Sequence, residues 1–189
     1  MKIDKTTGLL DEARQVASPN YDDRADESDF DLIVVHGISL PPGQYGGHWI
    51  DALFTNTLDA DAHPYFAEIH QMEVSSHLLI RRNGDIVQYV PFHKRAWHAG
   101  KSSYENRERC NDFSIGIELE GSDKEEYEAA QYQQLARVIQ TLCDTYPKLN
   151  TQRIAGHSDI APGRKTDPGP AFDWNRLFKL LAMDSPQQV

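Results

Sequence analysis

The chain has 189 residues, enough for one domain of ordinary size that buries a core without disulfide support. Its formal net charge of -10 and pI near 5.2 oppose binding to nucleic acid and to anionic membranes, because both are bound mainly through clustered lysine and arginine. Cys110 and Cys143 follow no metal-binding or secreted spacing, so reduced thiols are expected, with one disulfide as the alternative. Since neither a signal segment nor a run of about eighteen apolar residues occurs, we expect a soluble, non-exported monomer.

The first part of the chain combines a polar arm with one strongly apolar strand. Residues 1–28 are polar and end in a charge run, so we expect an irregular arm over the domain without a function of its own. The apolar run from Leu32 to Val35 predicts a buried strand that ends at His36. A loop rich in proline and glycine follows, and such a loop is a usual place for a functional site. Two short helices are predicted next, over 49–56 and 63–72.

A β-hairpin and a basic loop occupy the middle of the chain. Two apolar runs flank Asn83-Gly84, a pair that favours a two-residue hairpin turn. The loop after the hairpin is basic, against the acidic composition of the chain, which suggests an anionic ligand. A solvated charged face is the equal alternative. The basic residues of this loop are Lys94, Arg95, Lys101, Arg107 and Arg109.

Apolar and polar residues alternate from Phe113 to Glu120, which is the pattern of a strand with one covered face. Glu118 is expected on the other face. Ser114 and Gly116 lie on that same side and leave room for a ligand or water beside the carboxylate. Simple exposure of Glu118 to solvent is the alternative explanation.

Two amphipathic helices close the chain. Apolar spacing predicts a helix over about 128–146 that covers a sheet face and ends before Pro147. Asp173 is a suitable N-cap for a last helix whose apolar stripe comprises Trp174, Leu177, Phe178 and Leu181. Without repeats or linkers, we expect one domain over 29–183 and a tail over 184–189. These elements predict an α/β fold, a mixed sheet with helices on its faces.

The loop over 153–170 contains the side chains best suited to chemistry. It carries His157, Lys165 and Asp167, and its prolines and glycines exclude a continuous helix or strand. A catalytic zinc site needs three protein ligands and an open position for water, so His157 and Asp167 would need a third ligand. His36, held at the end of a buried strand, is the best candidate. Taken singly, Asp167 is more often a turn residue and His36 a strand-end residue, and the spacing of the combination alone leaves a metal site undecided.

Several long segments resemble one known family. From about residue 10 to residue 180, and in the same order, the chain is similar to zinc amidases of the N-acetylmuramoyl-L-alanine amidase and peptidoglycan-recognition-protein superfamily. The resemblance is strongest to the bacterial cytoplasmic amidases of cell-wall recycling. The segments that carry it are VVHGISLPPGQYGG, DALFTNTLDADAHPYF, IRRNGDIVQYVPFHKRAWHAG, ENRERCNDFSIGIELEG and GHSDIAPGRKTDPGPAFDW.

The resemblance implies a role for particular residues. The family's zinc ligands correspond to His36, His157 and Asp167, and its catalytic pair corresponds to Glu118 and Lys165. Substrate-binding residues around the site are implied as well. They are Tyr65, Trp97 and His98, together with Arg109, whose counterpart contacts the acidic end of the stem peptide.

Two departures from the family pattern affect recognition and leave the chemistry intact. The family often has asparagine after its first ligand, where this chain has Gly37, so a side-chain hydrogen bond is missing there. Related sequences tend to carry a basic residue where this chain has Met72-Glu73. Part of the peptide-recognition surface is therefore expected to differ.

The function implied by the resemblance is hydrolysis of one amide bond in an anhydro-muropeptide. The bond joins the lactyl group of 1,6-anhydro-N-acetylmuramic acid to L-alanine, and one Zn²⁺ per chain is implied. Recycling of peptidoglycan in the bacterial cytoplasm, with a negative effect on β-lactamase induction, follows from the same resemblance. The first alternative is a non-catalytic peptidoglycan-recognition module, although such modules generally lack a metal ligand. The second is an exported amidase, which the missing signal segment opposes.

Overall fold

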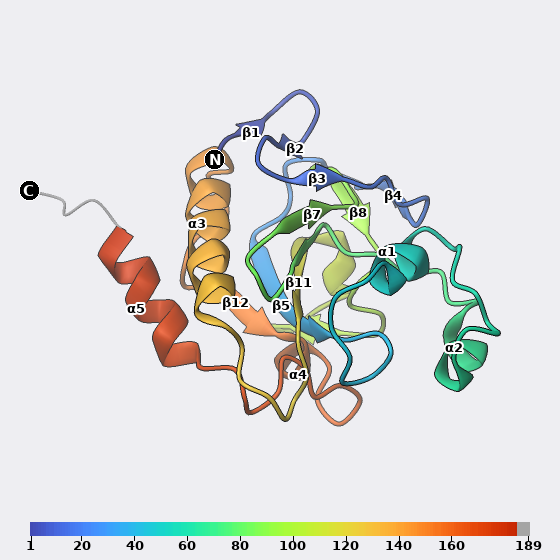
Figure 1. The fold of residues 1–189 in the computed structure, drawn as a ribbon. Helices are drawn as coiled ribbons and strands as arrows, with labels where there is room; N and C mark the ends of the chain where they lie inside the picture. The colour runs from blue at the N-terminus through green and yellow to red at the C-terminus, as the bar shows by residue number, and fades with distance from the viewer. Residues whose placement is uncertain (185–189) are drawn as a thin grey trace, which may run out of the picture.

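The apolar run at the start of the domain forms β5 (Leu32–Ile38), the centre of a six-stranded mixed sheet. Its first four side chains are fully buried. In space the strands follow the order β12-β5-β11-β6-β7-β3 (Figure 1). Their bounds are β3 (Arg14–Gln15), β6 (Leu78–Ile80), β7 (Ile86–Gln88), β11 (Ser114–Glu120) and β12 (Ile154–Gly156). The computed structural model describes residues 1–184, so residues 185–189 of the expected tail lie outside it.

Parallel pairing brings three chain segments to one end of the sheet. β11 runs parallel to β5 with Glu118 opposite His36. β12 also runs parallel to β5, on its other side, with Gly156 opposite Val35. His157 follows Gly156 directly, so it emerges beside His36. The carboxyl ends of neighbouring parallel strands are where ligands usually bind in such sheets.

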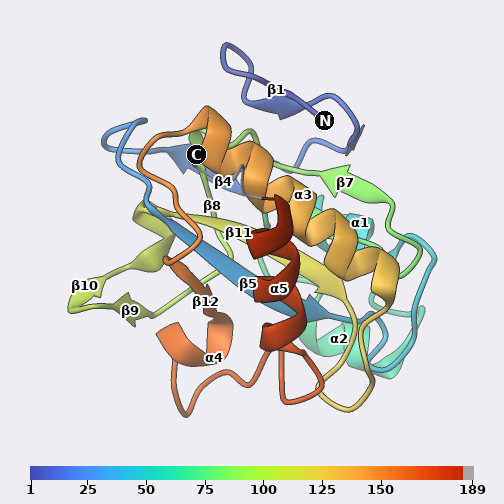
Figure 2. The same cartoon turned by 90° about the vertical axis from the view of Figure 1, so that its left-hand side faces the viewer.

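Helices cover both faces of the sheet. The predicted amphipathic helix is α3 (Ala129–Thr145), and α5 (Trp174–Asp184) lies against its outer side (Figures 1 and 2). Odd-numbered side chains of β5 and β11 pack toward α3 in the main core. The other face carries α1 (Trp49–Phe54) and α2 (Pro64–Ile69), which confirm the two short helices. The even-numbered side chains, including His36 and Glu118, therefore face away from α3.

The last helix differs from its prediction at one position. Asp173 caps α5, since its Oδ1 accepts a hydrogen bond from the amide of Arg176 at 3.1 Å. Leu177 and Leu181 are buried, as the stripe requires, but Phe178 is 43% exposed. It stacks on Trp174 at the surface instead of entering the core. The apolar stripe of α5 is thus narrower than the helical spacing suggests.

This difference predicts unequal effects of two truncations. Leu177→Ala should lower the free energy of unfolding by about 2–5 kcal/mol, because it removes a fully buried side chain. Phe178→Ala should cost less than about 1 kcal/mol, since much of the ring is already in water. Urea denaturation of both variants measures the difference. Equal losses would mean that Phe178 is part of the core after all.

The predicted hairpin is confirmed, but its turn is longer than two residues. β6 and β7 pair antiparallel, with Ile80 opposite Ile86. The amide of Arg81 donates to the carbonyl of Asp85 at 2.8 Å, and the amide of Gly84 donates to the carbonyl of Arg81 at 2.9 Å. Between Arg81 and Asp85, only Gly84 has positive φ, at 90°. The connection is therefore a turn followed by a glycine bulge. Such a connection matches the twist of the two strands without requiring a positive φ at Asn83.

The N-terminal segment is less irregular than its composition suggests. It contains β1 (Ile3–Asp4), β2 (Leu9–Leu10), β3 and β4 (Tyr21–Asp23), and β3 joins the edge of the main sheet. β4 pairs antiparallel with β8 (Lys94–Ala96) in the basic loop. The rest of that loop holds β9 (Ser103–Tyr104), β10 (Arg107–Glu108) and the 3-10 helix η1 (Cys110–Asp112).

Among the described residues, no helix is long and apolar enough to cross a membrane.

The acidic charges of the arm neutralise much of the basic loop. Lys94 pairs with Asp23 at 2.7 Å, and Arg107 pairs with Asp29 at 2.6 Å. Arg95 pairs with an arm residue too, since its Nη1 lies 3.0 Å from Asp22. Neither an anion site formed by all five basic residues nor a purely solvated face describes this loop. The sequence pattern missed the pairing because the two segments are about seventy residues apart.

Candidate metal centre and catalytic groove

His36, His157 and Asp167 converge at the carboxyl end of β5. The Nδ1 atoms of the two histidines are 2.9 Å apart. Oδ2 of Asp167 lies 3.2 Å from Nδ1 of His36 and 3.1 Å from Nδ1 of His157. A tetrahedral zinc ion with bonds of about 2.0–2.1 Å separates its ligand atoms by about 3.3 Å, so this triangle is close to the required size. The two nitrogens and the carboxylate oxygen point to one spot, which suits a cation.

Local structure explains why the loop after β12 returns to the strand end. His157 begins α4 (His157–Ile160), and the amide of Ser158 donates to the carbonyl of Asp167 at 2.9 Å. A side chain at Gly156 would place its Cβ only 3.0 Å from Pro168. The glycine therefore allows the loop to close over the strand end and brings Asp167 to the two histidines.

The protonation states of the cluster suit metal binding. Burial lowers the pKa of His36 to about 4, so its imidazole is neutral at pH 7. Burial acts to raise the pKa of Asp167, but hydrogen bonds from His157 and His36 outweigh it and hold that pKa below its usual range. Asp167 is therefore a carboxylate. A neutral imidazole and an ionised carboxylate are the forms that coordinate a metal.

Glu118 places a second carboxylate beside this triangle. Its Oε1 lies 3.9 Å from Nδ1 of His36, and its Oε2 is buried without a hydrogen-bond partner. Burial, reinforced by the charge of Asp167, raises the pKa of Glu118 well above its ordinary value. A buried, unpartnered carboxylate of this kind is a candidate general base. The alternative of simple solvent exposure at this position is wrong, because the side chain is only 10% exposed.

A groove of about 500 Å³ opens over the cluster. Its lining includes apolar Leu53, Ile69 and Val74 and the aromatic residues Tyr65 and Trp97. It also includes polar Lys165, Arg164 and Asp123. The charge of Lys165 reaches Glu118 and acts to lower its pKa. The groove can therefore hold a ligand with one apolar and one anionic part.

Of the residues expected at the substrate, His98 is largely buried and Arg109 lies outside the groove. His98 touches the groove but is buried behind His36, where its Nδ1 lies 2.9 Å from Nε2 of that histidine. Arg109 does not line the groove. Its exposed side chain pairs with Asp112 at 3.1 Å and borders a separate cavity of about 290 Å³, which Arg164 also lines. Arg164 is the residue that the two cavities share.

Tyr127 is a site residue that the sequence pattern did not indicate. Its hydroxyl donates to the carbonyl of Pro168 at 2.9 Å and so ties down the loop after Asp167. A Cβ at Gly37 would lie 2.3 Å from this hydroxyl. The tyrosine therefore fills the space beside Gly37, and an asparagine there would need it to move. Glu73, the other departure, is exposed and lies outside the groove.

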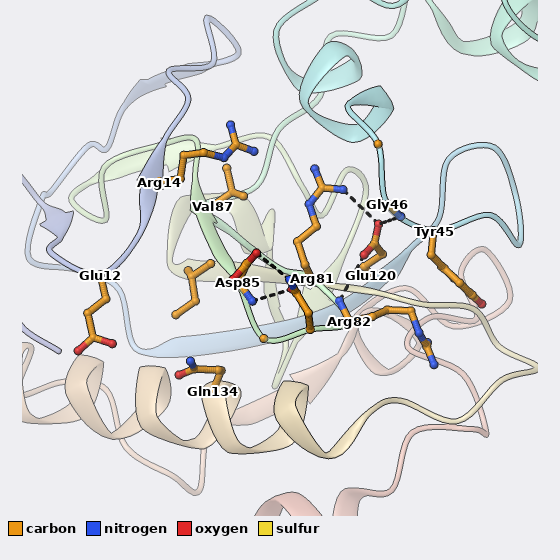
Figure 3. A pocket seen from close by; sticks show the side chains of 14 residues that line it. Glu12, Arg14, Tyr45, Gly46, Arg81, Arg82, Asp85, Val87, Glu120 and Gln134 are labelled. Carbon is orange, nitrogen blue, oxygen red and sulfur yellow. Dashed lines mark hydrogen bonds and ion pairs between the residues drawn. The ribbon is translucent and has the colours of Figure 1, made fainter.

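A third cavity, of about 650 Å³, is lined by residues of the loop after β5 and by three arginines, Arg14, Arg81 and Arg82 (Figure 3). Buried Glu120 accepts hydrogen bonds from Arg81 at 3.1 Å and from the amide of Gly46 at 2.7 Å. Its polar contacts hold this loop in place. No group of three metal-binding side chains other than the triangle occurs in the described part of the chain.

A metal-binding triangle and a buried carboxylate at the ends of parallel strands define a candidate metal-dependent hydrolase. Residues 26–170 match the family described as N-acetylmuramoyl-L-alanine amidase. The chain therefore belongs to the N-acetylmuramoyl-L-alanine amidase family. The expected α/β architecture is confirmed by the solved structures that resemble it.

Relatives similar to the chain along nearly its whole length share one description. The 1,6-anhydro-N-acetylmuramyl-L-alanine amidase AmpD of Salmonella typhimurium strain SL1344 is 63% identical over 182 residues, covering 96% of this chain and 97% of that protein. The AmpD of Escherichia coli K12 is 62% identical over 178 residues, covering 94% and 97%. A crystal structure of a Se-Met AmpD derivative superposes with a TM-score of 0.92 at 62% identity, covering 96% and 99%.

A more distant structure contains a substrate. It is the complex of the E. coli amidase AmiD with anhydro-N-acetylmuramic acid-L-Ala-D-gamma-Glu-L-Lys. That chain is 32% identical with a TM-score of 0.57, and the match covers 94% of this chain and 65% of that one.

Proposed function

We propose that this chain hydrolyses the amide bond between the lactyl group of 1,6-anhydro-N-acetylmuramic acid and L-alanine of the stem peptide, with one zinc ion bound by His36, His157 and Asp167. The proposal rests on one observation: Oε2 of Glu118, which has no hydrogen-bond partner among the described residues, lies beside three ligand atoms whose spacing is close to that around a zinc ion. The descriptions of the relatives support the choice of bond. The substrate in the AmiD complex supports the anhydro-muropeptide as the ligand class.

The protein groups divide the reaction between them. A zinc ion at the triangle would supply Lewis acidity, which makes water more acidic and polarises the amide carbonyl. Glu118 accepts the proton of the attacking water at its free oxygen and returns it to the leaving amine nitrogen. Lys165 holds a positive charge near the oxygen on which negative charge develops.

The lining of the groove suggests which groups bind which part of the substrate. Tyr65 and Trp97 offer aromatic surface to the sugar ring, while the charges of Lys165 and Arg164 suit an anionic peptide. We assign Arg109 to the acidic end of the stem peptide, beyond Arg164. On this assignment Arg109→Ala should raise KM for substrates with a longer acidic peptide and leave kcat nearly unchanged. Steady-state kinetics with two peptide lengths measures this.

Lys165→Ala should lower kcat by about 100- to 1000-fold, the usual cost of removing one group that stabilises an oxyanion. Zinc content should stay at one ion per chain, because Lys165 is no part of the triangle. The assay measures release of stem peptide from anhydro-muropeptide. The matched control is Lys124→Ala, because Lys124 is an exposed lysine outside the groove. This control variant should retain full activity. A Lys165→Ala variant as active as this control would remove lysine from the mechanism.

We further propose that the enzyme acts in the bacterial cytoplasm during peptidoglycan recycling and that its loss raises β-lactamase induction. The unpaired state of Cys110 and Cys143 supports a reducing compartment. Cell fractionation with an antibody against the chain tests the location. Recovery of the protein in the periplasm would favour the exported amidase instead.

A further inference from the structure

The two histidines of the triangle present their outer ring nitrogens to consecutive residues of one loop. Nε2 of His36 lies 2.9 Å from Nδ1 of His98, and Nε2 of His157 lies 3.2 Å from the carbonyl oxygen of Ala99. When the two Nδ1 atoms bind a metal, each Nε2 carries the ring proton and can donate it outward. Partners of this kind fix the tautomer and the ring orientation of metal ligands. Both ligands therefore depend on the placement of the pair His98-Ala99.

One side chain binds both amides of this pair, while Arg164 donates to the Ala99 carbonyl at 2.6 Å. Oδ1 of Asn111 accepts hydrogen bonds from the amide of His98 at 3.1 Å and from the amide of Ala99 at 2.7 Å. Asn111 is 8% exposed and belongs to η1, directly before the strand that carries Glu118. With one oxygen shared between two amides, Asn111 fixes the two successive peptide units on either side of His98. The His98 ring projects from between these units, and the Ala99 carbonyl begins the next one.

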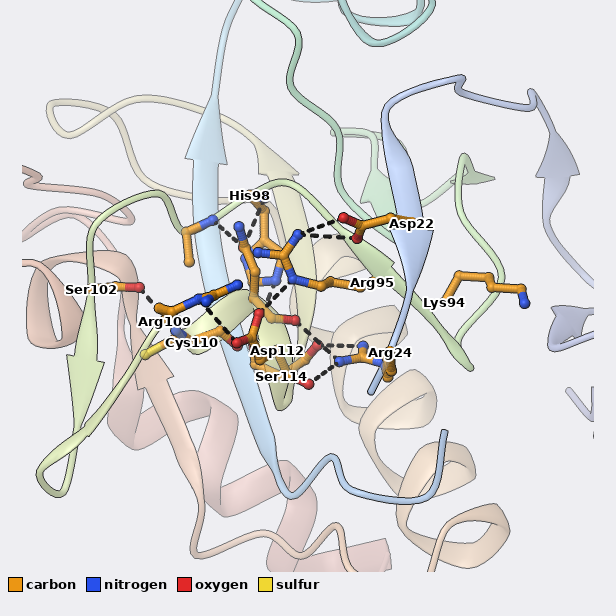
Figure 4. A network of polar contacts seen from close by, with 12 residues as sticks. Asp22, Arg24, Lys94, Arg95, His98, Ser102, Arg109, Cys110, Asp112 and Ser114 are labelled. Carbon is orange, nitrogen blue, oxygen red and sulfur yellow. Dashed lines mark hydrogen bonds and ion pairs between the residues drawn. The ribbon is translucent and has the colours of Figure 1, made fainter. Parts of the chain in front are cut away.

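The His98 ring is constrained from its other side as well. Its Nε2 lies 3.2 Å from Oγ of Ser114, and that hydroxyl donates to the carbonyl of Cys110 at 2.6 Å (Figure 4). His98 Nε2 therefore donates to Ser114, and its Nδ1 accepts from His36. A Cβ at Gly116 would lie 2.4 Å from the ring, so only glycine leaves room for it there. The space beside Gly116 is thus filled by a histidine that orients a ligand.

The N-terminal arm anchors the same network. Buried Arg24 donates to the carbonyl oxygens of Asn111 at 3.1 Å, Asp112 at 2.9 Å and Ser114 at 2.7 Å (Figure 4). These contacts fix η1 and the start of β11 together. The arm, expected to carry no function, therefore supports the segment on which both histidines rely.

From this geometry we propose that Asn111 is a positioning residue that sets the orientation of both histidine zinc ligands through the His98-Ala99 pair. The proposal rests on the zinc site proposed above. Asn111 touches neither the metal position nor the groove, so its effect is on zinc affinity. Outer-shell partners of metal ligands typically contribute about 10- to 100-fold to metal affinity.

The test is the zinc dissociation constant, measured by competition with a chromophoric chelator. Asn111→Ala, which loses both hydrogen bonds, should raise Kd by about 10- to 100-fold. Asn111→Asp keeps an acceptor oxygen in the same place and should bind zinc within about threefold of the parent protein. The control is Gln88→Ala. Gln88 is an equally buried amide that binds the backbone of Leu10 and Gly8, away from the triangle.

Gln88→Ala should lower the melting temperature without changing the zinc Kd, which separates positioning from general stability. An Asn111→Ala variant with the parental Kd would overturn the inference. If Asn111→Ala does not fold, Asn111→Asp provides the test. This variant retains the acceptor oxygen, so a zinc Kd raised more than tenfold would contradict the proposed role. A parent protein that binds no zinc would instead overturn the zinc site itself.

Discussion

Glu118→Gln is expected to reduce kcat by about 100- to 10,000-fold while one zinc ion stays bound per chain. Glutamine has the same shape as glutamate, but its amide cannot accept a proton from water at neutral pH. The carboxylate stands opposite His36 in the parallel register of β11 and β5, and its Oε2 has no hydrogen-bond partner among residues 1–184. The substitution therefore removes the base and leaves the triangle intact.

Two measurements separate this effect from a structural one. Metal content by mass spectrometry should be unchanged, and the melting temperature should not fall, since a buried carboxylate is replaced by a neutral group. Glu125→Gln, an exposed position in the loop after β11, makes the same change in charge and should keep full activity. Turnover by Glu118→Gln within tenfold of the parent would assign the base to another group.

Asp167→Ala should weaken zinc binding by more than about 100-fold and abolish activity at ordinary zinc concentrations. Asp167 is the only anionic member of the triangle, and its Oδ2 lies within 3.2 Å of both histidine nitrogens. Loss of an outer-shell partner alone costs about 10- to 100-fold in affinity, so loss of a ligand should exceed that range. Two neutral imidazoles would remain, with no negative charge to balance the ion.

Asp173→Ala is the matched control for this second substitution. Asp173 lies in the same part of the chain, but it caps α5 instead of facing the triangle. Its loss should lower the free energy of unfolding by about 1 kcal/mol and leave the zinc Kd unchanged. Full zinc retention by Asp167→Ala would contradict the ligand set, whatever the activity of the variant.

Local sequence patterns predicted the elements that carry the site. Alternation over β11 placed Glu118 on the face away from α3, and the apolar run before His36 predicted the strand that holds it. The contacts that complete the site come from tertiary structure. The contact of His98 with His36 joins residues that are 62 positions apart, so no local period reveals it.

The errors in the sequence-based predictions have the same physical origin. Three charges of the basic loop are paired with acidic residues far away in the chain, so less free positive charge remains there than the composition suggests. Phe178 has the spacing of a core residue, yet α5 packs on only part of α3 and leaves it in solvent. Gly116 suggested free space beside Glu118, but the ring of His98 occupies it. Sequence periodicity predicts which face of a helix or strand is buried. Which residues pack against that face depends on the whole fold.

The measurement that tests the central claim most directly is metal content of the purified protein, coupled to release of stem peptide from anhydro-muropeptide with and without a chelator. We expect one zinc ion per chain, loss of peptide release after chelation, and recovery when zinc is restored. Metal-free protein that releases stem peptide at the same rate, or zinc-loaded protein that binds the muropeptide without cleaving it, would contradict the account.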